Sequence, residues 1–181
     1  MSLLKIARMG HPVLRRRADP VDPAVLARPE VQRLIDDMIE TMRDAPGVGL
    51  AAPQVYESIR LFVMDPGGSD EGEPGLRVVV NPELAFPFRE KMRLWEGCLS
   101  MPGIRGETER WAEVEVECLD REGRPTKFTA QDYPAAIVQH ETDHLDGILF
   151  LARMPAPLEI SFEEEFALYH AEPPSEEDDA V

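Results

Sequence analysis

One feature constrains the fold of this chain more than any other: the pattern His140-Glu141-Thr142-Asp143-His144, which matches H-E-x-x-H. In a helix, residues four positions apart lie about one turn apart on one face, so both imidazoles can bind a single metal ion. Glu141 follows the first histidine directly, which brings its carboxylate within reach of water at the metal but outside the ligand set, where a general base belongs. The chain is therefore expected to contain a helix whose histidines face a metal site.

The residues around this motif predict the bounds and the orientation of its helix. Asp132 is a residue type that caps helices, Pro134 fits the first turn, and Gly147 predicts the end. Ile137 lies three residues before His140, so the histidines share their face of the helix with an apolar residue. We therefore expect the metal ligands to point into the protein.

Two histidines need a third protein ligand if one metal position is to stay open for water, and two kinds of residue could supply it. In metallopeptidases of the Glu-ligand zincin type, that ligand is a glutamate about twenty residues downstream, and residues 163–165 are all glutamates. The alternative is Cys98, because the small residues of Glu96-Gly-Cys-Leu-Ser100 leave its thiol accessible. Cys118, the other cysteine, is expected to be a core residue of a strand. Spacing alone leaves both ligand sets open.

Hydrophobic periodicity predicts the remaining elements. Apolar residues recur three and four positions apart from 31 to 42, which predicts a helix over 28–43. Gly47–Gln54 reads as a loop or irregular strand, and Asn81-Pro82 should end a strand. The predicted strands cover residues 60–64, 76–80, 112–119 and 126–129. The last two are joined by a turn over 120–123 into a hairpin, and a third amphipathic piece covers 158–169.

Composition limits the class of protein. The chain has 181 residues, with 19 basic against 35 acidic residues and a net charge of -16, which repels phosphate backbones. We therefore expect no nucleic-acid binding through bulk charge. No apolar run approaches the roughly 18 residues of a membrane span, and the N-terminus lacks a signal-peptide layout, which favours a cytoplasmic location. We predict a single catalytic domain over 1–170, an exposed loop over 66–75, and an acidic, disordered tail over 171–181.

Three motifs in order resemble peptide deformylase. They are Gly47-Val-Gly-Leu-Ala-Ala-Pro-Gln54, Glu96-Gly-Cys-Leu-Ser100 and Gln139-His-Glu-Thr-Asp-His144. The similarity includes Gly10-His-Pro-Val-Leu-Arg15, Arg105 and Arg110, and covers residues 6–151. The resemblance implies an α+β fold with short, mostly antiparallel strands around the H-E-x-x-H helix. It also implies a hydrolase that removes the formyl group from formyl-methionyl nascent polypeptides and releases formate.

The resemblance assigns a role to each motif residue. The implied metal ligands are Cys98, His140 and His144. Glu141 is implied to be the general base and acid, and the Gln54 amide and the Leu99 backbone N–H are implied to stabilise the oxyanion. The implied cofactor is one divalent metal ion. Members of the family usually hold Fe²⁺, although Zn²⁺, Ni²⁺ or Co²⁺ also fits a site of two imidazoles and a thiolate. A catalytically inert metal-binding or partner-binding domain is the remaining alternative. Such a domain would need none of Glu141, Gln54 and Cys98 merely to fold.

The implied substrate is an extended peptide that begins with formyl-methionine. The residues expected to bind it are Val48, Gly49, Leu94, Gly97, Arg105, Tyr133, Ala136 and Ile137. Family members pair the segment around Gly49 backbone to backbone with the substrate. Ala136 stands where the family often has arginine, which should enlarge this part of the pocket wall. Ordinary core packing is the alternative for Leu94, Tyr133, Ala136 and Ile137.

Overall fold

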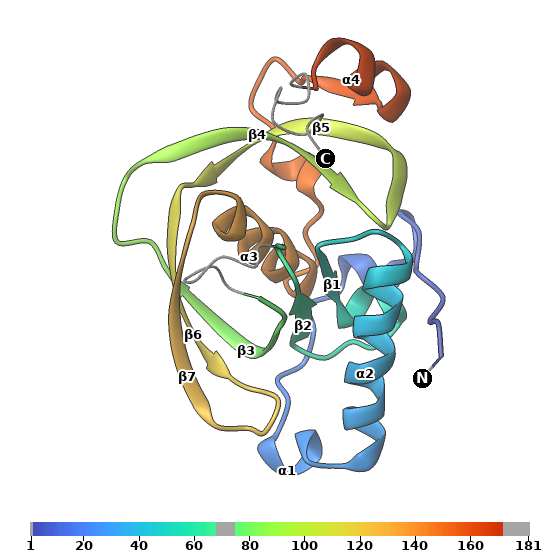
Figure 1. Cartoon of the computed structure of the whole chain (residues 1–181), viewed down its shortest axis with the longest axis vertical. Coiled ribbons are helices and arrows are strands. Elements are labelled where there is room, and N and C mark those ends of the chain that lie inside the picture. The colour runs from blue at the N-terminus through green and yellow to red at the C-terminus, as the bar shows by residue number, and fades with distance from the viewer. Residues whose placement is uncertain (1, 68–74, 172–181) are drawn as a thin grey trace, which may run out of the picture.

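The computed structural model describes residues 2–67 and 75–171, and helix α3 (Asp132–Leu145) runs through the middle of the molecule (Figure 1). Every residue of α3 from Ala135 to Leu145 is buried, so the helix is enclosed on all faces rather than on one stripe. It contacts strands of two separate sheets. The predicted α+β fold, with mostly antiparallel strands around the helix that carries H-E-x-x-H, is confirmed.

A five-stranded antiparallel sheet covers one side of α3. Its strand order is β1 (Gly49–Ala51), β2 (Leu61–Met64), β3 (Arg77–Ala85), β6 (Glu113–Leu119) and β7 (Pro125–Gln131). Both β6 and β7 alternate buried with more exposed positions, because one face of the hairpin packs on the core. The predicted hairpin is confirmed, and Cys118 is buried on β6 as expected.

A second, three-stranded sheet closes the other side. It contains β4 (Lys91–Cys98), β5 (Met101–Trp111) and β8 (Ile160–Phe162), with β5 in the middle. The register between β4 and β5 shifts between Gly97 and Cys98, so the regular pairing is interrupted beside the predicted metal ligand. Neither β4 nor β5 was among the strands predicted from the sequence.

Helix α2 (Pro29–Asp44) confirms the helix predicted over 28–43, and it packs against β1 and β2. Its buried side chains, Ile35, Met38 and Met42, belong to one core cluster with residues of β2. The remaining helical elements are η1 (Pro12–Arg15), α1 (Pro23–Leu26), η2 (Ala52–Val55), η3 (Phe150–Arg153) and α4 (Glu163–Tyr169). Segment Gly47–Gln54 is thus a short strand followed by a 3-10 turn.

Three local predictions were wrong. Asp132 is not the cap of α3: Gln131 occupies that position without a side-chain hydrogen bond, and Asp132 is the first helical residue at φ 51°. Asn81-Pro82 does not end β3, because the strand continues through a bulge. Asn81 takes φ 51° there, and its amide exchanges two 2.8 Å hydrogen bonds with the backbone of Val21. The amphipathic piece over 158–169 splits into β8 and α4.

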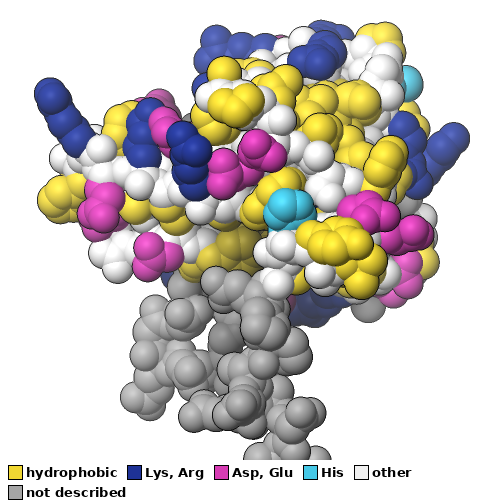
Figure 2. Space-filling view, turned by 90° about the horizontal axis from the view of Figure 1, so that it is seen from above, with side chains coloured by type: hydrophobic (Ala, Val, Ile, Leu, Met, Phe, Trp, Pro, Cys, Tyr) yellow, Lys and Arg dark blue, Asp and Glu magenta, His cyan; other side chains and the backbone are white. Residues whose placement is uncertain are grey.

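The surface around α4 carries both apolar and charged side chains. The face that carries α4 shows hydrophobic side chains among acidic and basic ones (Figure 2), and Phe162, Leu168 and Tyr169 are each more than two-thirds exposed. Of the described helices, none is long and apolar enough to cross a membrane. Residues 68–74 of the predicted loop and residues 172–181 of the predicted tail lie outside the described residues.

Candidate metal centre and active site

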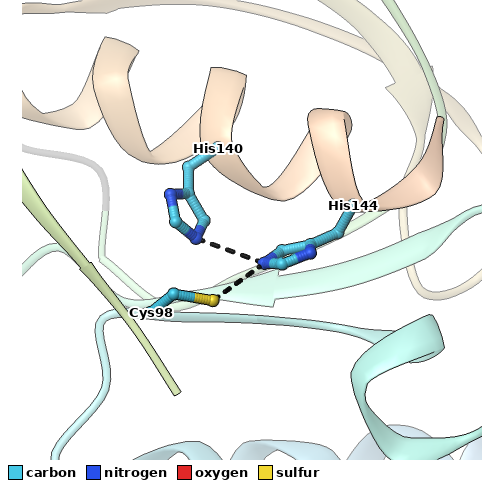
Figure 3. Close-up of side chains that lie close together, drawn as sticks. All are labelled: Cys98, His140 and His144. Carbon is cyan, nitrogen blue, oxygen red and sulfur yellow. Dashed lines mark hydrogen bonds between the residues drawn. The ribbon is translucent and has the colours of Figure 1, made fainter. Parts of the chain in front are cut away.

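Cys98 at the end of β4 meets His140 and His144 of α3 at one buried point (Figure 3). The Cys98 Sγ lies 3.3 Å from the His144 Nε2, which lies 3.2 Å from the His140 Nε2. All three ligand atoms lie within 4.8 Å of one another. A tetrahedral ion with bonds of about 2.0–2.3 Å would hold its ligand atoms roughly 3.3–3.6 Å apart. The spacing therefore fits one metal ion.

The protonation of these groups also suits a metal. The His140 Nδ1 contacts the Glu96 Oε2 at 2.7 Å, which leaves the Nε2 to face the site. Burial opposes ionisation of the Cys98 thiol, but the charge of His144 and hydrogen bonds from both histidines outweigh it and hold the thiol pKa well below its usual range. A thiolate and two imidazole nitrogens are a ligand set for a transition metal.

A buried network of charges holds Glu96 in place. Arg110 on β5 donates to both Glu96 oxygens, at 2.6 and 3.0 Å, and to the Asp143 Oδ2 at 2.6 Å. Arg153 of η3 binds the other side of Asp143 through two hydrogen bonds of 2.6 and 3.0 Å. The network thus connects β4, β5, α3 and η3 behind His140. Arg110 was named only as part of the family resemblance, and no role of this kind was predicted for any member of the network.

Glu141 lies beside the ligands with its carboxylate inside the protein. It is almost fully buried, and its Oε2 has no hydrogen-bond partner among the described residues. Burial raises the pKa of its carboxyl to about 7, against the opposing charges of His140 and His144. Gly49 of β1 leaves room for this side chain: a Cβ built there would meet the Glu141 Oε1 and would lie 2.8 Å from the Cδ. Gly49 was predicted to lie against the substrate, and its contact with the Glu141 side chain was not predicted.

Gln54, in η2, is held with its amide toward the ligands. Its Oε1 accepts a 2.8 Å hydrogen bond from the Ala51 N–H. Its Nε2 donates to the Ser100 Oγ at 3.3 Å and approaches the Cys98 Sγ at 3.7 Å. The Gln54 side chain is 1% exposed, which fixes an N–H donor at the edge of the ligand site.

One cavity of about 480 Å³ opens onto this centre. Its lining includes the predicted residues Cys98, His140, Glu141, Gln54, Leu99, Val48, Gly49, Leu94, Gly97, Arg105, Tyr133, Ala136 and Ile137. His144 is the exception, because it lies behind the other ligands at 1% exposure. Ala136 and Ile137 are buried in the wall, whereas Tyr133 is about half exposed at the opening.

The structure separates the two candidate third ligands. The cluster of ligand atoms found within the described residues contains Cys98 and none of the glutamates at 163–165. Glu163 does line the cavity, but its Oε1 accepts a 3.0 Å hydrogen bond from Arg105. The geometry therefore favours the thiolate ligand set over the zincin one.

Known proteins are similar to this chain in sequence and in fold. The model of the polypeptide deformylase family matches residues 3–158. Peptide deformylase 2 of Nostoc sp. is 43% identical over 168 residues, covering 91% of this chain and 93% of that relative. The peptide deformylase of Halothermothrix orenii is 44% identical over 154 residues, covering 85% and 95%. The Met-Ala-Ser-bound structure of a class I type b peptide deformylase from Acinetobacter baumannii aligns at TM-score 0.78 and 40% identity, covering 85% and 100%.

Proposed function

The chain belongs to the polypeptide deformylase family, the metallohydrolases that remove the N-terminal formyl group from nascent polypeptides, and we propose that its buried centre carries this reaction. The supporting observation is the meeting of Cys98, His140 and His144 beside the Glu141 carboxylate, whose Oε2 has no hydrogen-bond partner among the described residues. We infer that these three residues bind the divalent metal ion that the family requires. Ferrous iron is the proposed native ion, and zinc, nickel or cobalt suits the same ligands.

The proposed mechanism uses a bound metal ion and three groups of the chain, which are the Glu141 carboxylate, the Gln54 amide and the Leu99 backbone N–H. Cys98, His140 and His144 would hold a divalent cation, which would supply Lewis-acid chemistry for the formyl carbonyl and for water. The Glu141 carboxylate accepts the proton of the attacking water. It then returns that proton to the amine nitrogen as the bond from nitrogen to the formyl carbon breaks. The products are formate and a free N-terminal amine.

Gln54 and Leu99 are proposed to stabilise the negative oxygen that develops on the formyl carbon. The Gln54 Nε2 already points to the Cys98 side of the site, and its carbonyl is anchored to the Ala51 backbone. A donor fixed before the reaction needs no reorganisation when the charge appears. The Leu99 backbone N–H, one residue beyond the ligand cysteine, is the proposed second donor.

The cavity accommodates an extended peptide. Within residues 2–67 and 75–171, β1 is an edge strand that pairs with β2 on one side, and Val48 and Gly49 line the cavity. An extended chain can add to such an edge by backbone hydrogen bonds, while the methionine side chain fills a pocket walled by Leu94, Ala136 and Ile137. The proposed partner is a formyl-methionyl peptide or nascent chain, met in the cytoplasm, where new polypeptides emerge.

Formate release from a formyl-Met-Ala peptide by anaerobically purified, iron-loaded protein tests this function. Replacing Glu141 by Gln should lower kcat between about 10² and 10⁴-fold, because the amide cannot take the proton. The exposed Glu30→Gln variant should keep full activity. Metal content, measured by elemental analysis, should be retained by Glu141→Gln and lost by Cys98→Ala.

Two further arms of this experiment separate the alternatives. Exposure to air should inactivate the iron-loaded protein and spare the zinc-loaded one, because a thiolate beside ferrous iron is open to oxidation. Cleavage of an unformylated peptide together with retained metal in Cys98→Ala would instead support a peptidase. Failure of the metal-loaded protein to release formate would refute the proposal.

A further inference from the structure

The segment after the family match forms part of the active-site cavity. The match ends at residue 158, whereas β8 pairs with β5 at residues 160–162 and α4 follows directly. Glu163, the first residue of α4, lines the same cavity as His140 and Glu141. Glu163 therefore contributes a carboxylate to the wall of the cleft.

Within the cleft, Glu163 is paired with Arg105. The Arg105 guanidinium donates to the Glu163 Oε1 at 3.0 Å, and its Cζ lies 5.0 Å from the centre of the Phe166 ring. Arg105 pairs with Gly97 across β4 and β5, and a Cβ built on Gly97 would lie 3.9 Å from the Arg105 Cζ. The guanidinium thus lies over the strand residue that precedes Cys98. Its Nε is buried and has no partner among the described residues.

Aromatic packing fixes α4 in this position. Phe166 lies 5.3 Å from Trp95 of β4, and His170 lies 4.8 Å from the same indole, measured between ring centres. Trp95 also lines the cavity. The side chains that hold α4 on the sheet are therefore continuous with the wall that faces a bound peptide.

We propose that Glu163 determines specificity by pairing with Arg105, so that the cleft disfavours an acidic side chain at the third residue of the substrate. In an extended peptide, residues one and three face the same side, about 6.6 Å apart. Arg105 lines the cavity together with the proposed methionine pocket, so the third side chain passes it. With Glu163 in place, an acidic side chain must displace a carboxylate to reach Arg105, whereas a basic one can pair with Glu163. This inference rests on the proposed function.

The test compares the peptides formyl-Met-Ala-X-Ala-amide, with X as Glu, Gln or Lys. The amide end removes a terminal carboxylate that could itself bind Arg105. Wild-type protein should show kcat/KM in the order Lys, Gln, Glu. Glu163→Gln should raise the ratio of kcat/KM for the Glu peptide to that for the Lys peptide by roughly three- to fivefold, the upper part of the range of an exposed ion pair. The change should shrink at high ionic strength.

Glu164→Gln is the matched control, because it removes the same charge from the next residue of α4, which does not line the cavity. Its ratio should equal that of the wild type. An unchanged ratio in Glu163→Gln, or an equal shift in both variants, would overturn the inference while leaving deformylation intact. Absence of formate release by wild-type protein from the Gln peptide would instead refute the proposed function.

Discussion

At the scale of single residues, the position of the Glu141 carboxylate depends on the missing side chain of Gly49. A methyl group at Gly49 would have to occupy space already filled by the Oε1 and Cδ of Glu141. The acid is enclosed, so either the carboxylate or strand β1 must move. We expect Gly49→Ala to lower kcat by about a hundredfold, measured as formate release, while metal content stays at one ion per chain.

Gly75→Ala provides the control for this substitution. Among the residues that the structure describes, a Cβ at Gly75 meets nothing within 4 Å, and the Gly75 φ lies outside the left-handed region. This variant should keep the wild-type kcat. Full activity in Gly49→Ala would show that the Glu141 carboxylate does not need its present position.

The residues of the site differ in how readily the sequence predicts their place in it. The histidines and Glu141 share one helix, so their spacing alone predicts their contact. Cys98 comes from a strand 42 residues earlier, counted from Cys98 to His140, and only the resemblance chose it over the glutamates at 163–165. Glu163 remained hidden as a cleft residue, because its contact with Arg105 depends on the pairing of β8 with β5.

At the scale of elements, hydrophobic patterns predicted those whose buried side chains are apolar, including β2, which is buried along its whole length. The helix over 28–43 and the hairpin of β6 and β7 were found, because each shows a regular apolar face. Strands β4 and β5 were missed, because their buried positions include Glu96, Thr108 and Arg110. These polar residues are buried because they satisfy one another, which a hydrophobic pattern cannot register.

Arg110 connects three elements, and its removal should damage both stability and the metal site. Arg110→Met leaves the carboxylates of Glu96 and Asp143 buried with less compensating charge, at a cost of about 3–5 kcal/mol in the free energy of unfolding. Metal affinity should fall roughly 10- to 100-fold, because Glu96 orients His140. Urea denaturation and competition with a metal indicator measure the two effects.

Lys91→Met tests the specificity of that result. Lys91 pairs with Glu109 at 2.6 Å across the same two strands, but both side chains are substantially exposed. Removing this charge should leave the urea midpoint and the metal affinity close to wild type. Equal losses in both variants would show that the charge of the sheet, rather than the buried network, supports the site.

At the scale of the whole molecule, the three-stranded sheet is joined to α3 and η3 behind the metal centre by charge as well as by apolar packing. Arg110 and Arg153 hold Asp143 of α3 between β5 and η3. The apolar core is divided into separate clusters, one of which contains Cys98 with Leu14, Leu149 and Phe150. No hydrophobic pattern along the chain predicts this arrangement, since the carboxylates and guanidiniums come from four elements that are separate in the sequence and meet only in the folded protein.

This arrangement predicts how stability depends on pH. Burial opposes ionisation of Glu96 and Asp143, but hydrogen bonds from His140 and Arg110 in the first case, and from Arg153 together with the charge of Arg110 in the second, lower both carboxyl pKa values. The unfolded chain therefore binds more protons than the folded one below the ordinary carboxyl pKa of about 4.

The contribution of these carboxylates to the free energy of unfolding should be fully present above about pH 5 and should fall steadily as the pH drops below about 4. Urea denaturation of the metal-loaded and the chelator-treated protein across this range separates protonation of the network from loss of the metal. Arg153→Met removes two hydrogen bonds to Asp143 and should flatten the acid limb in both forms. An acid limb that is unchanged by this substitution would place the pH dependence elsewhere in a molecule of net charge -16.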